Sequence, residues 1–156
     1  MKTNKLKNNA GFTLIELIVV ITILGLLSAY ALPRFAAVQT EARIAKMNGA
    51  LASLKSGAAL AHAIQLTQQL AATSPVTMEG SSILMNDGYP TTDATAIPVA
   101  AGLASPDFVL VVTSSTVFTV SADTNHPNCA VTYTVPAALG SPPTYSSAGL
   151  IAANCS

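Results

Sequence analysis

One carboxylate stands in an apolar stretch near the start of the chain. Glu16 is the single charged residue among the 21 residues from Phe12 to Leu32. A charge deep in a lipid-spanning helix costs about 2.5–3.5 kcal/mol on insertion scales, so it is expected to have a partner and a function. Cleavage after Gly11 would create a cationic amine on Phe12, on the same helix face as Glu16. We therefore predict that this amine pairs with Glu16 of a neighbouring chain, each charge offsetting the burial cost of the other.

Two cysteines, Cys129 and Cys155, lie near the C-terminus. An even count in an exported chain is typical of a disulfide, whereas a cytosolic protein would keep two reduced, buried thiols. A bridge between them would close a loop of about 27 residues, worth roughly 3.5 kcal/mol in the chain-entropy model. We predict the bridge, because the N-terminal segment indicates export.

The other residues that could bind ligands form no recognisable site. His62 falls on a predicted helix and His126 in a loop, and neither has a second ligand at metal spacing. Asp87, Asp93 and Asp123 lack the spacing of an EF-hand, although calcium binding by the C-terminal part stays open. No glycine-rich phosphate loop, nucleophile motif or carboxylate pair occurs. We therefore predict no enzyme activity, no catalytic residue, no metal and no cofactor.

Charge is distributed unevenly along the 156 residues. Seven basic and seven acidic residues give a net charge of zero, and 51% of the residues are hydrophobic. Lys2, Lys5 and Lys7 precede the apolar stretch, and Lys55 is the last basic residue. The leading lysines predict a cytoplasmic N-terminus and an outward C-terminal part. A neutral chain with a mildly acidic C-terminal part is not expected to bind nucleic acid.

The apolar stretch itself admits three interpretations. As an α-helix, residues 12–32 would span about 31 Å, enough to cross a bilayer. A secretory signal would be removed at the Ala29-Tyr30-Ala31 site, and a plain membrane anchor would be retained. A precursor cut before the stretch would keep it in the mature protein. Glu16 favours the third interpretation, because neither a disposable signal nor a simple anchor needs a carboxylate there.

The residues at this junction resemble a known family. Gly11-Phe12-Thr13-Leu14-Ile15-Glu16 is similar to the cleavage and methylation box of type IV prepilins and pseudopilins. The resemblance, strong over about residues 1–60, implies that a prepilin peptidase removes the leader, residues 1–11, and N-methylates Phe12. It also implies that Glu16 is needed for methylation and for docking to a neighbouring subunit.

The same resemblance implies where the protein works. The subunit would wait in the inner membrane, in a Gram-negative bacterium. Assembly machinery in that membrane would then build a homo-oligomeric helical filament outside the cell.

A long helix must position these groups. Apolar residues spaced by three and four continue beyond the apolar stretch and predict one helix over about residues 12–72. Its first half, 12–32, would lie in the membrane or the filament core, and its second half, 33–72, would be amphipathic. Gly25 and Pro33 are weak points in it. By resemblance the helix between them unwinds in an assembled filament, and a simple kink is the alternative.

Residues 73–156 are predicted to form a β-rich head with a C-terminal disulfide loop. Strands at 108–113 and 116–121 would form a hairpin, and 130–135 a third strand. Turn residues predict a loop over 81–98, and a fourth edge strand near 137–147 stays open. The fold class is therefore α+β, a pilin fold with one long helix on a small antiparallel sheet of three or four strands. Residues 86–90 resemble pilins of the mannose-sensitive haemagglutinin type.

Several functions fit this organisation. The leading prediction is a structural subunit of a pilus filament that serves adhesion or surface attachment. A type II secretion pseudopilin or a competence pilin is the alternative within the family. The predicted disulfide and the lack of a clear calcium site argue against the former, and the absence of Lys or Arg after Lys55 argues against DNA capture. A secreted soluble binding domain cut after Ala31 is the alternative from another class.

Overall fold

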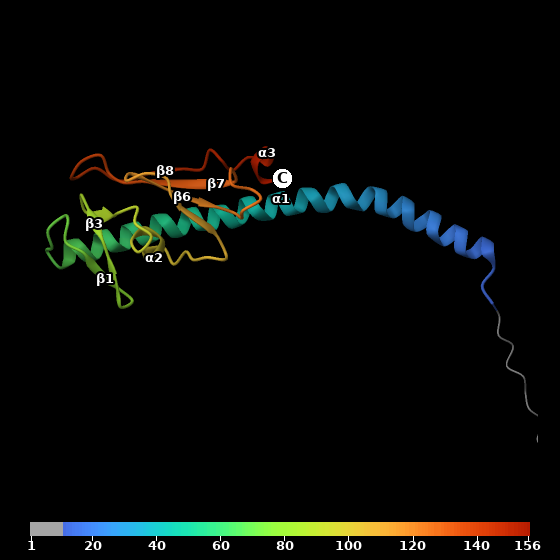
Figure 1. The fold of residues 1–156 in the computed structure, drawn as a ribbon, viewed down its shortest axis with the longest axis horizontal. Coiled ribbons are helices and arrows are strands. Elements are labelled where there is room, and N and C mark those ends of the chain that lie inside the picture. The colour runs from blue at the N-terminus through green and yellow to red at the C-terminus, as the bar shows by residue number, and fades with distance from the viewer. Residues whose placement is uncertain (1–10) are drawn as a thin grey trace, which may run out of the picture. The chain divides into compact units, whose positions relative to one another are not determined.

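The computed structural model describes residues 11–156, so most of the predicted leader lies outside the described residues. The chain divides into two compact units, the first ending at Ala37 and the second spanning Val38–Ser156. The elements in chain order are α1 (Leu14–Thr67), β1 (Val76–Met78), β2 (Ser81–Ile83), β3 (Met85–Asn86), β4 (Tyr89–Pro90), α2 (Ile97–Ala100), β5 (Val109–Val112), β6 (Val117–Ser121), β7 (Ala130–Thr134), β8 (Thr144–Ser146) and α3 (Ala152–Cys155) (Figure 1). This is the predicted α+β class.

Helix α1 is continuous over 54 residues but ends at Thr67 rather than at the predicted residue 72. The chain leaves the helix because Gln69 adopts a left-handed conformation with φ of 54°. The backbone N–H of Leu70 then donates to the Gln65 carbonyl, and that of Gln69 to the Leu66 carbonyl, each at 3.1 Å. This is the Schellman pattern, which usually places glycine where Gln69 stands. Without a glycine there, the sequence carried no clear stop signal before Ser74-Pro75.

A four-stranded antiparallel sheet in the order β5-β6-β7-β8 forms the largest part of the head. The predicted hairpin is confirmed as β5 and β6, the third predicted strand is β7, and β8 is the fourth edge strand that the sequence left open. Alternate residues of β6 and β7 are buried, and they pack on the stripe of α1 that carries Met47, Leu54 and Ala58. In Figure 1 this sheet lies along one side of the second half of α1.

The predicted loop over residues 81–98 is wrong, because it contains regular structure. Strands β1 and β2 form one two-stranded ribbon, β3 and β4 form another, and the short helix α2 follows. Each of these strands has two or three residues, too few for an alternating pattern to be visible. The turn between β3 and β4 contains Asp87 and Gly88, both with positive φ, as a two-residue type I′ turn requires.

A glycine in α1 has a packing role. A Cβ atom at Gly57 would lie 2.4 Å from the carbonyl oxygen of Ala100, at the end of α2. Glycine weakens a helix, but no other residue allows α2 to approach α1 this closely.

Candidate functional site

The predicted cleavage site lies in exposed, non-helical chain. Residues 11–13 precede the first turn of α1, and the side chain of Phe12 is 88% exposed. A peptide bond outside a helix can adopt the extended form that a peptidase needs, because no helical hydrogen bond holds it. The described residues therefore show Gly11 and Phe12 outside the helix and exposed, and cleavage between them stays a prediction.

Glu16 has a local role that the sequence argument missed. Its backbone N–H donates to Thr13 Oγ1 at 3.3 Å, and its Oε2 accepts the backbone N–H of Thr13 at 3.2 Å. This reciprocal pair is a capping box, which satisfies two of the free N–H groups at a helix start. The Thr-x-x-Glu spacing of Thr13 and Glu16 was the available signal. Glu16 can therefore stabilise the end of α1, and its pairing with a neighbouring chain stays a prediction.

Apolar side chains surround α1 in the first unit and remain exposed. The large ones are Leu14, Ile15, Leu17, Ile18, Val19, Val20, Ile21, Ile23, Leu24, Leu26, Leu27, Tyr30, Leu32 and Phe35. By length and composition α1 could cross a membrane, although a signal sequence would meet the same test. A helix that is apolar on every side is stable only inside a membrane or a larger assembly. This surface needs a covering that the chain does not itself provide among residues 11–156.

The two predicted weak points lie within intact helix. Gly25 and Pro33 are both inside α1, and Pro33 does not end it. A proline removes one helical hydrogen bond and clashes with the turn before it, so the cost of unwinding is lowered locally. Unwinding between Gly25 and Pro33 in a filament stays a prediction.

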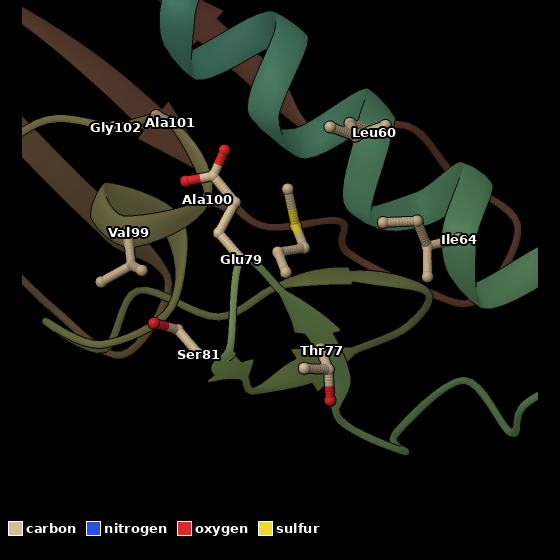
Figure 2. A pocket seen from close by; sticks show the side chains of 10 residues that line it. Leu60, Ile64, Thr77, Glu79, Ser81, Val99, Ala100, Ala101 and Gly102 are labelled. Carbon is tan, nitrogen blue, oxygen red and sulfur yellow. The ribbon is translucent and has the colours of Figure 1, made fainter.

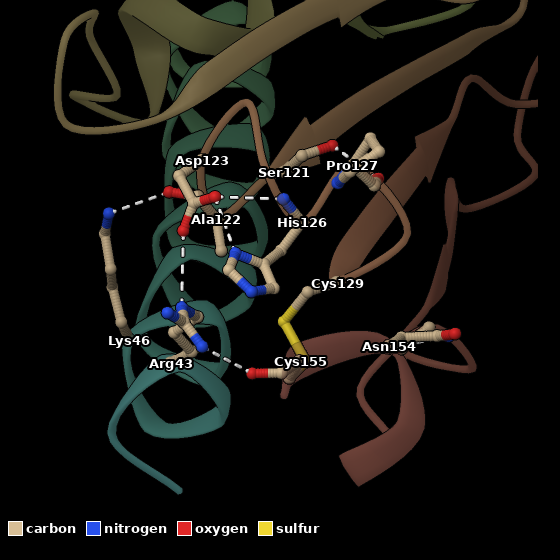
Figure 3. The surroundings of a disulfide bond; sticks show 11 residues. Arg43, Lys46, Ser121, Ala122, Asp123, His126, Pro127, Cys129, Asn154 and Cys155 are labelled. Atoms are coloured by element: carbon tan, nitrogen blue, oxygen red, sulfur yellow. Dashed lines mark hydrogen bonds and ion pairs between the residues drawn. A yellow bond between two sulfur atoms is a disulfide. The ribbon is translucent and has the colours of Figure 1, made fainter. Parts of the chain in front are cut away.

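The predicted disulfide is confirmed. Cys129 and Cys155 are bonded, and both are fully buried. The bridge joins the residue before β7 to the last residue of α3 (Figure 3). It therefore fixes the C-terminus of the chain to the sheet.

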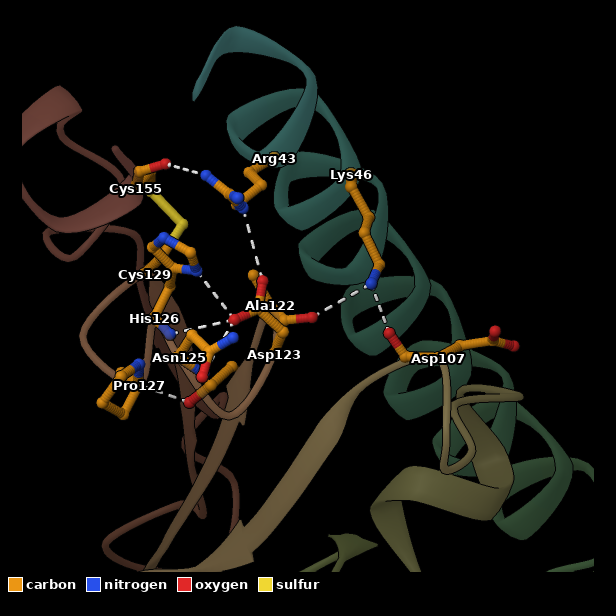
Figure 4. Close-up of polar contacts among 11 residues, drawn as sticks. Arg43, Lys46, Asp107, Ala122, Asp123, Asn125, His126, Pro127, Cys129 and Cys155 are labelled. Atoms are coloured by element: carbon orange, nitrogen blue, oxygen red, sulfur yellow. Dashed lines mark hydrogen bonds and ion pairs between the residues drawn. A yellow bond between two sulfur atoms is a disulfide. The ribbon is translucent and has the colours of Figure 1, made fainter. Parts of the chain in front are cut away.

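A second set of contacts holds the same region to α1. We call Arg43, Lys46, Asp123 and His126 the clasp (Figure 4). Arg43 donates from Nη1 to the Cys155 carbonyl at 2.7 Å, and its Nε lies 3.3 Å from Asp123 Oδ2. Lys46 donates to the carbonyls of Ala122, at 3.0 Å, and Asp107. The clasp was missed, because its members lie far apart in the sequence and no motif connects them.

The Asp123 carboxylate accepts several hydrogen bonds at the centre of the clasp. His126 donates from Nδ1 to Oδ1 at 2.7 Å, and the backbone N–H groups of Asn125 and His126 donate to the same oxygen at 2.9 Å. The pKa of this carboxyl lies below its ordinary value, chiefly because of the His126 side chain, with the Asn125 N–H adding to it and partial burial opposing it. These bonds favour the ionised form in the folded state.

The head should therefore lose stability in acid through Asp123. A carboxyl with a lowered folded pKa contributes stability above its unfolded pKa, and loses it as the pH falls through the folded value, below about pH 4. Urea unfolding of residues 38–156 at pH 3 and at pH 6 would give the free energy of unfolding at each pH. The decrease from pH 6 to pH 3 should be smaller for Asp123→Asn than for the wild type. Asp93→Asn is the control for losing a surface carboxylate, since the exposed Asp93 side chain accepts a hydrogen bond from Thr91 Oγ1 and lies outside the clasp. An unchanged difference in Asp123→Asn would contradict the expectation.

The remaining candidate ligands are not brought together. His62 stacks on Tyr89 with ring centroids 4.2 Å apart, and its Nδ1 lies 2.6 Å from the Gly88 carbonyl. Asp87 bonds to Asn86, whereas Asp123 belongs to the clasp. Within residues 11–156, no group of three or more His, Cys, Asp or Glu residues is arranged to hold a metal ion.

Comparisons with known proteins give two matches, one of which is confined to the start of the chain. Residues 6–32 match the family model described as the prokaryotic N-terminal methylation motif. The chain is also 45% identical over 51 residues to the type IV narrow pilus major component PilA5 of Thermus thermophilus. That match spans 33% of this chain and 44% of the relative. No solved structure gives a significant match.

The matched motif contains the predicted cleavage junction and the carboxylate in the apolar stretch. It includes Gly11, Phe12 and Glu16 and extends to Leu32, the end of the apolar stretch. The secretory-signal and plain-anchor interpretations do not account for such a motif. The chain thus carries a prokaryotic N-terminal methylation motif at the start of one long apolar helix.

Proposed function

We propose that the mature chain is the building block of an extracellular pilus filament that serves adhesion or surface attachment. A prepilin peptidase would cut between Gly11 and Phe12 on the cytoplasmic side and N-methylate Phe12. The methylation motif over residues 6–32 and the exposed junction before α1 support this processing. The relative from Thermus thermophilus is named as a pilus major component, which favours a pilus over a secretion pseudopilus.

The observation that carries the proposal is the exposed apolar surface of α1 around a single carboxylate. Each large apolar side chain contributes about 1.5–3 kcal/mol when it moves from water to a fully apolar environment. The membrane supplies that environment before assembly, and the helices of other subunits supply it in a filament. A contact between two different surfaces of neighbouring subunits can repeat along the assembly. If the rotation between neighbours does not return to the first subunit, the result is an open helical filament rather than a closed ring.

Glu16 would set the register of this assembly. Apolar burial is non-directional and would allow neighbouring helices to slide. The amine of Phe12 and the carboxylate of Glu16 can both be buried only where they meet, because each unpaired buried charge costs several kcal/mol. Pairing between subunits therefore selects one axial offset among the many offsets that bury a similar apolar area.

The head would form the surface of the filament. Its disulfide fits an oxidising compartment outside the cytoplasm. Contact of these heads with an external surface would give attachment without any chemical reaction.

The intact mass of the exported subunit tests the processing. We expect a chain that begins at Phe12 and carries one methyl group on its amine, because the peptidase acts before the apolar stretch. Mass spectrometry with N-terminal sequencing of sheared surface filaments would measure both. A chain that begins at Leu32 would instead support a secreted domain, and a chain that retains Lys2, Lys5 and Lys7 would exclude cleavage at Gly11.

A further inference from the structure

Among the basic residues that the structure describes, Arg34 differs in that its side chain makes no polar contact. Arg43 and Lys46 are held in the clasp, and Lys55 Nζ lies 5.7 Å above the ring of Tyr145. Arg34 is exposed on α1 and makes no hydrogen bond or ion pair with residues 11–156. Beyond Lys55 the head has no Lys or Arg. Arg34 is thus the cation most available to a second copy of the chain.

A groove in the head contains a carboxylate that also lacks a partner. This groove is a hollow of about 480 Å³ that is open to solvent and is lined by α1, the β1–β2 ribbon and α2 (Figure 2). Leu60 and Val99 on its walls are 54% and 41% exposed, and Ile64 and Met78 add further apolar surface. Glu79 is the one charged residue of the lining, and Figure 2 shows its side chain reaching from the ribbon toward α2.

The local fold does not explain why this residue is glutamate. Glu79 and Gly80 form the two-residue turn between β1 and β2, with φ of 49° and 81°. Such a turn favours asparagine, aspartate or glycine at its first position, because other side chains are strained at positive φ. Within residues 11–156, the Glu79 carboxylate makes no hydrogen bond or ion pair. Strained residues of this kind often belong to binding surfaces.

We propose that this groove receives the α1 segment around Arg34 from a second copy of the chain. The Arg34 guanidinium would bind the Glu79 carboxylate, in the two-point geometry that arginine allows. Phe35, which is 67% exposed, would cover the apolar walls. The proposal rests on the proposed function, because it describes a contact inside the filament. It is a contact between two different surfaces, so it repeats from subunit to subunit.

The spacing along α1 sets the offset that this contact requires. Leu60 and Ile64 of the groove follow Arg34 by 26 and 30 residues. At about 1.5 Å per residue, parallel helices of the two copies would be displaced by roughly 40 Å. The partners are therefore not immediate neighbours paired through Glu16, whose amine contact needs an offset of only about 6 Å. The groove would join more distant subunits.

Two other carboxylates that make no hydrogen bond or ion pair within residues 11–156, those of Glu41 and Asp107, are poorer partners. Both are exposed, and neither lines the hollow that contains Glu79. An ion pair on open surface contributes little, whereas a partly enclosed pair is screened less by water and salt. Glu79 is the carboxylate that combines charge with a surface for Phe35.

Charge reversal in cells that make the full chain tests the pairing. We expect Arg34→Glu and Glu79→Arg each to lower the fraction of subunit in sheared filaments at least about 10-fold, since like charges would face each other. The double variant should return to within about 2-fold of wild type, since the pair is restored in reverse. Combining Arg34→Glu with Glu41→Arg or Asp107→Arg gives matched controls, which should not recover.

Glu79→Asn separates assembly from folding. Asparagine suits the turn better than glutamate, so the thermal midpoint of the full-length subunit in detergent should rise while filament yield falls. No rescue in the Arg34→Glu/Glu79→Arg variant, or rescue by Glu41→Arg or Asp107→Arg instead, would overturn the proposed pairing but leave the filament function intact. Absence of this subunit from wild-type filaments would overturn both.

Discussion

Glu16→Val is expected to leave the subunit in the membrane and to abolish filament assembly. Valine is more apolar than glutamate, so membrane insertion should not suffer. In a filament, however, the Phe12 amine of each subunit would be buried without a counter-charge. Removing one partner of a buried ion pair costs about 3–5 kcal/mol, equivalent to at least about 100-fold in an association constant. Immunoblots of membrane and sheared filament fractions would measure the two outcomes.

Loss of the capping box is a second explanation for an assembly defect in a Glu16 variant, beside loss of the charge pair. Two further variants distinguish the two explanations. Glu16→Gln keeps an oxygen that can accept the Thr13 N–H but removes the charge, because glutamine also completes a capping box. Thr13→Ala breaks the box and keeps the charge. We expect Glu16→Gln to lose assembly and Thr13→Ala to retain most of it. The reverse pattern would assign Glu16 to the helix end and remove it from subunit pairing.

The sequence predicted the features that depend on local spacing. The Gly11–Phe12 junction, Glu16 and the apolar stretch are contiguous, so the motif and the helix could be identified together. The β5–β6 hairpin was predictable because apolar strands flank a short polar turn, and the disulfide because an exported chain with two cysteines favours a bridge. In each case the information lies within a short segment or in a count.

Features that depend on distant contacts were not predictable. Arg43 meets the Cys155 carbonyl across 112 residues of sequence, and nothing near either residue signals the other. The β1–β2 and β3–β4 ribbons are too short for periodicity, and the groove around Glu79 exists only once α2 packs at Gly57. The capping box of Thr13 and Glu16, by contrast, is a local feature that the Thr-x-x-Glu spacing indicates.

Removing the disulfide is expected to cost the head a large part of its stability. The bridge joins residues 26 apart, so Cys129→Ala/Cys155→Ala should lower the free energy of unfolding of residues 38–156 by about 2–4 kcal/mol. A domain of this size has a total stability of about 5–15 kcal/mol. Urea titration of the fragment would measure the loss. A change below about 0.5 kcal/mol, within the usual range for a surface substitution, would show that the bridge does not restrain the unfolded chain.

The stability lost with the disulfide is expected to depend on Arg43, because the disulfide and the clasp hold the same end of the chain. Without the bridge, the end of α3 can leave the sheet, and the Cys155 carbonyl that accepts from Arg43 leaves with it. Arg43→Ala should therefore cost less in the bridge-free head than in the wild type, with a coupling energy of about 0.5–1 kcal/mol or more. Tyr133→Phe is the matched control. It removes the hydrogen bond to the Pro90 carbonyl, about 13 Å along β7 from Cys129, and should cost the same in both backgrounds. Equal costs for Arg43→Ala in both backgrounds would mean that the disulfide and the clasp hold the C-terminus independently.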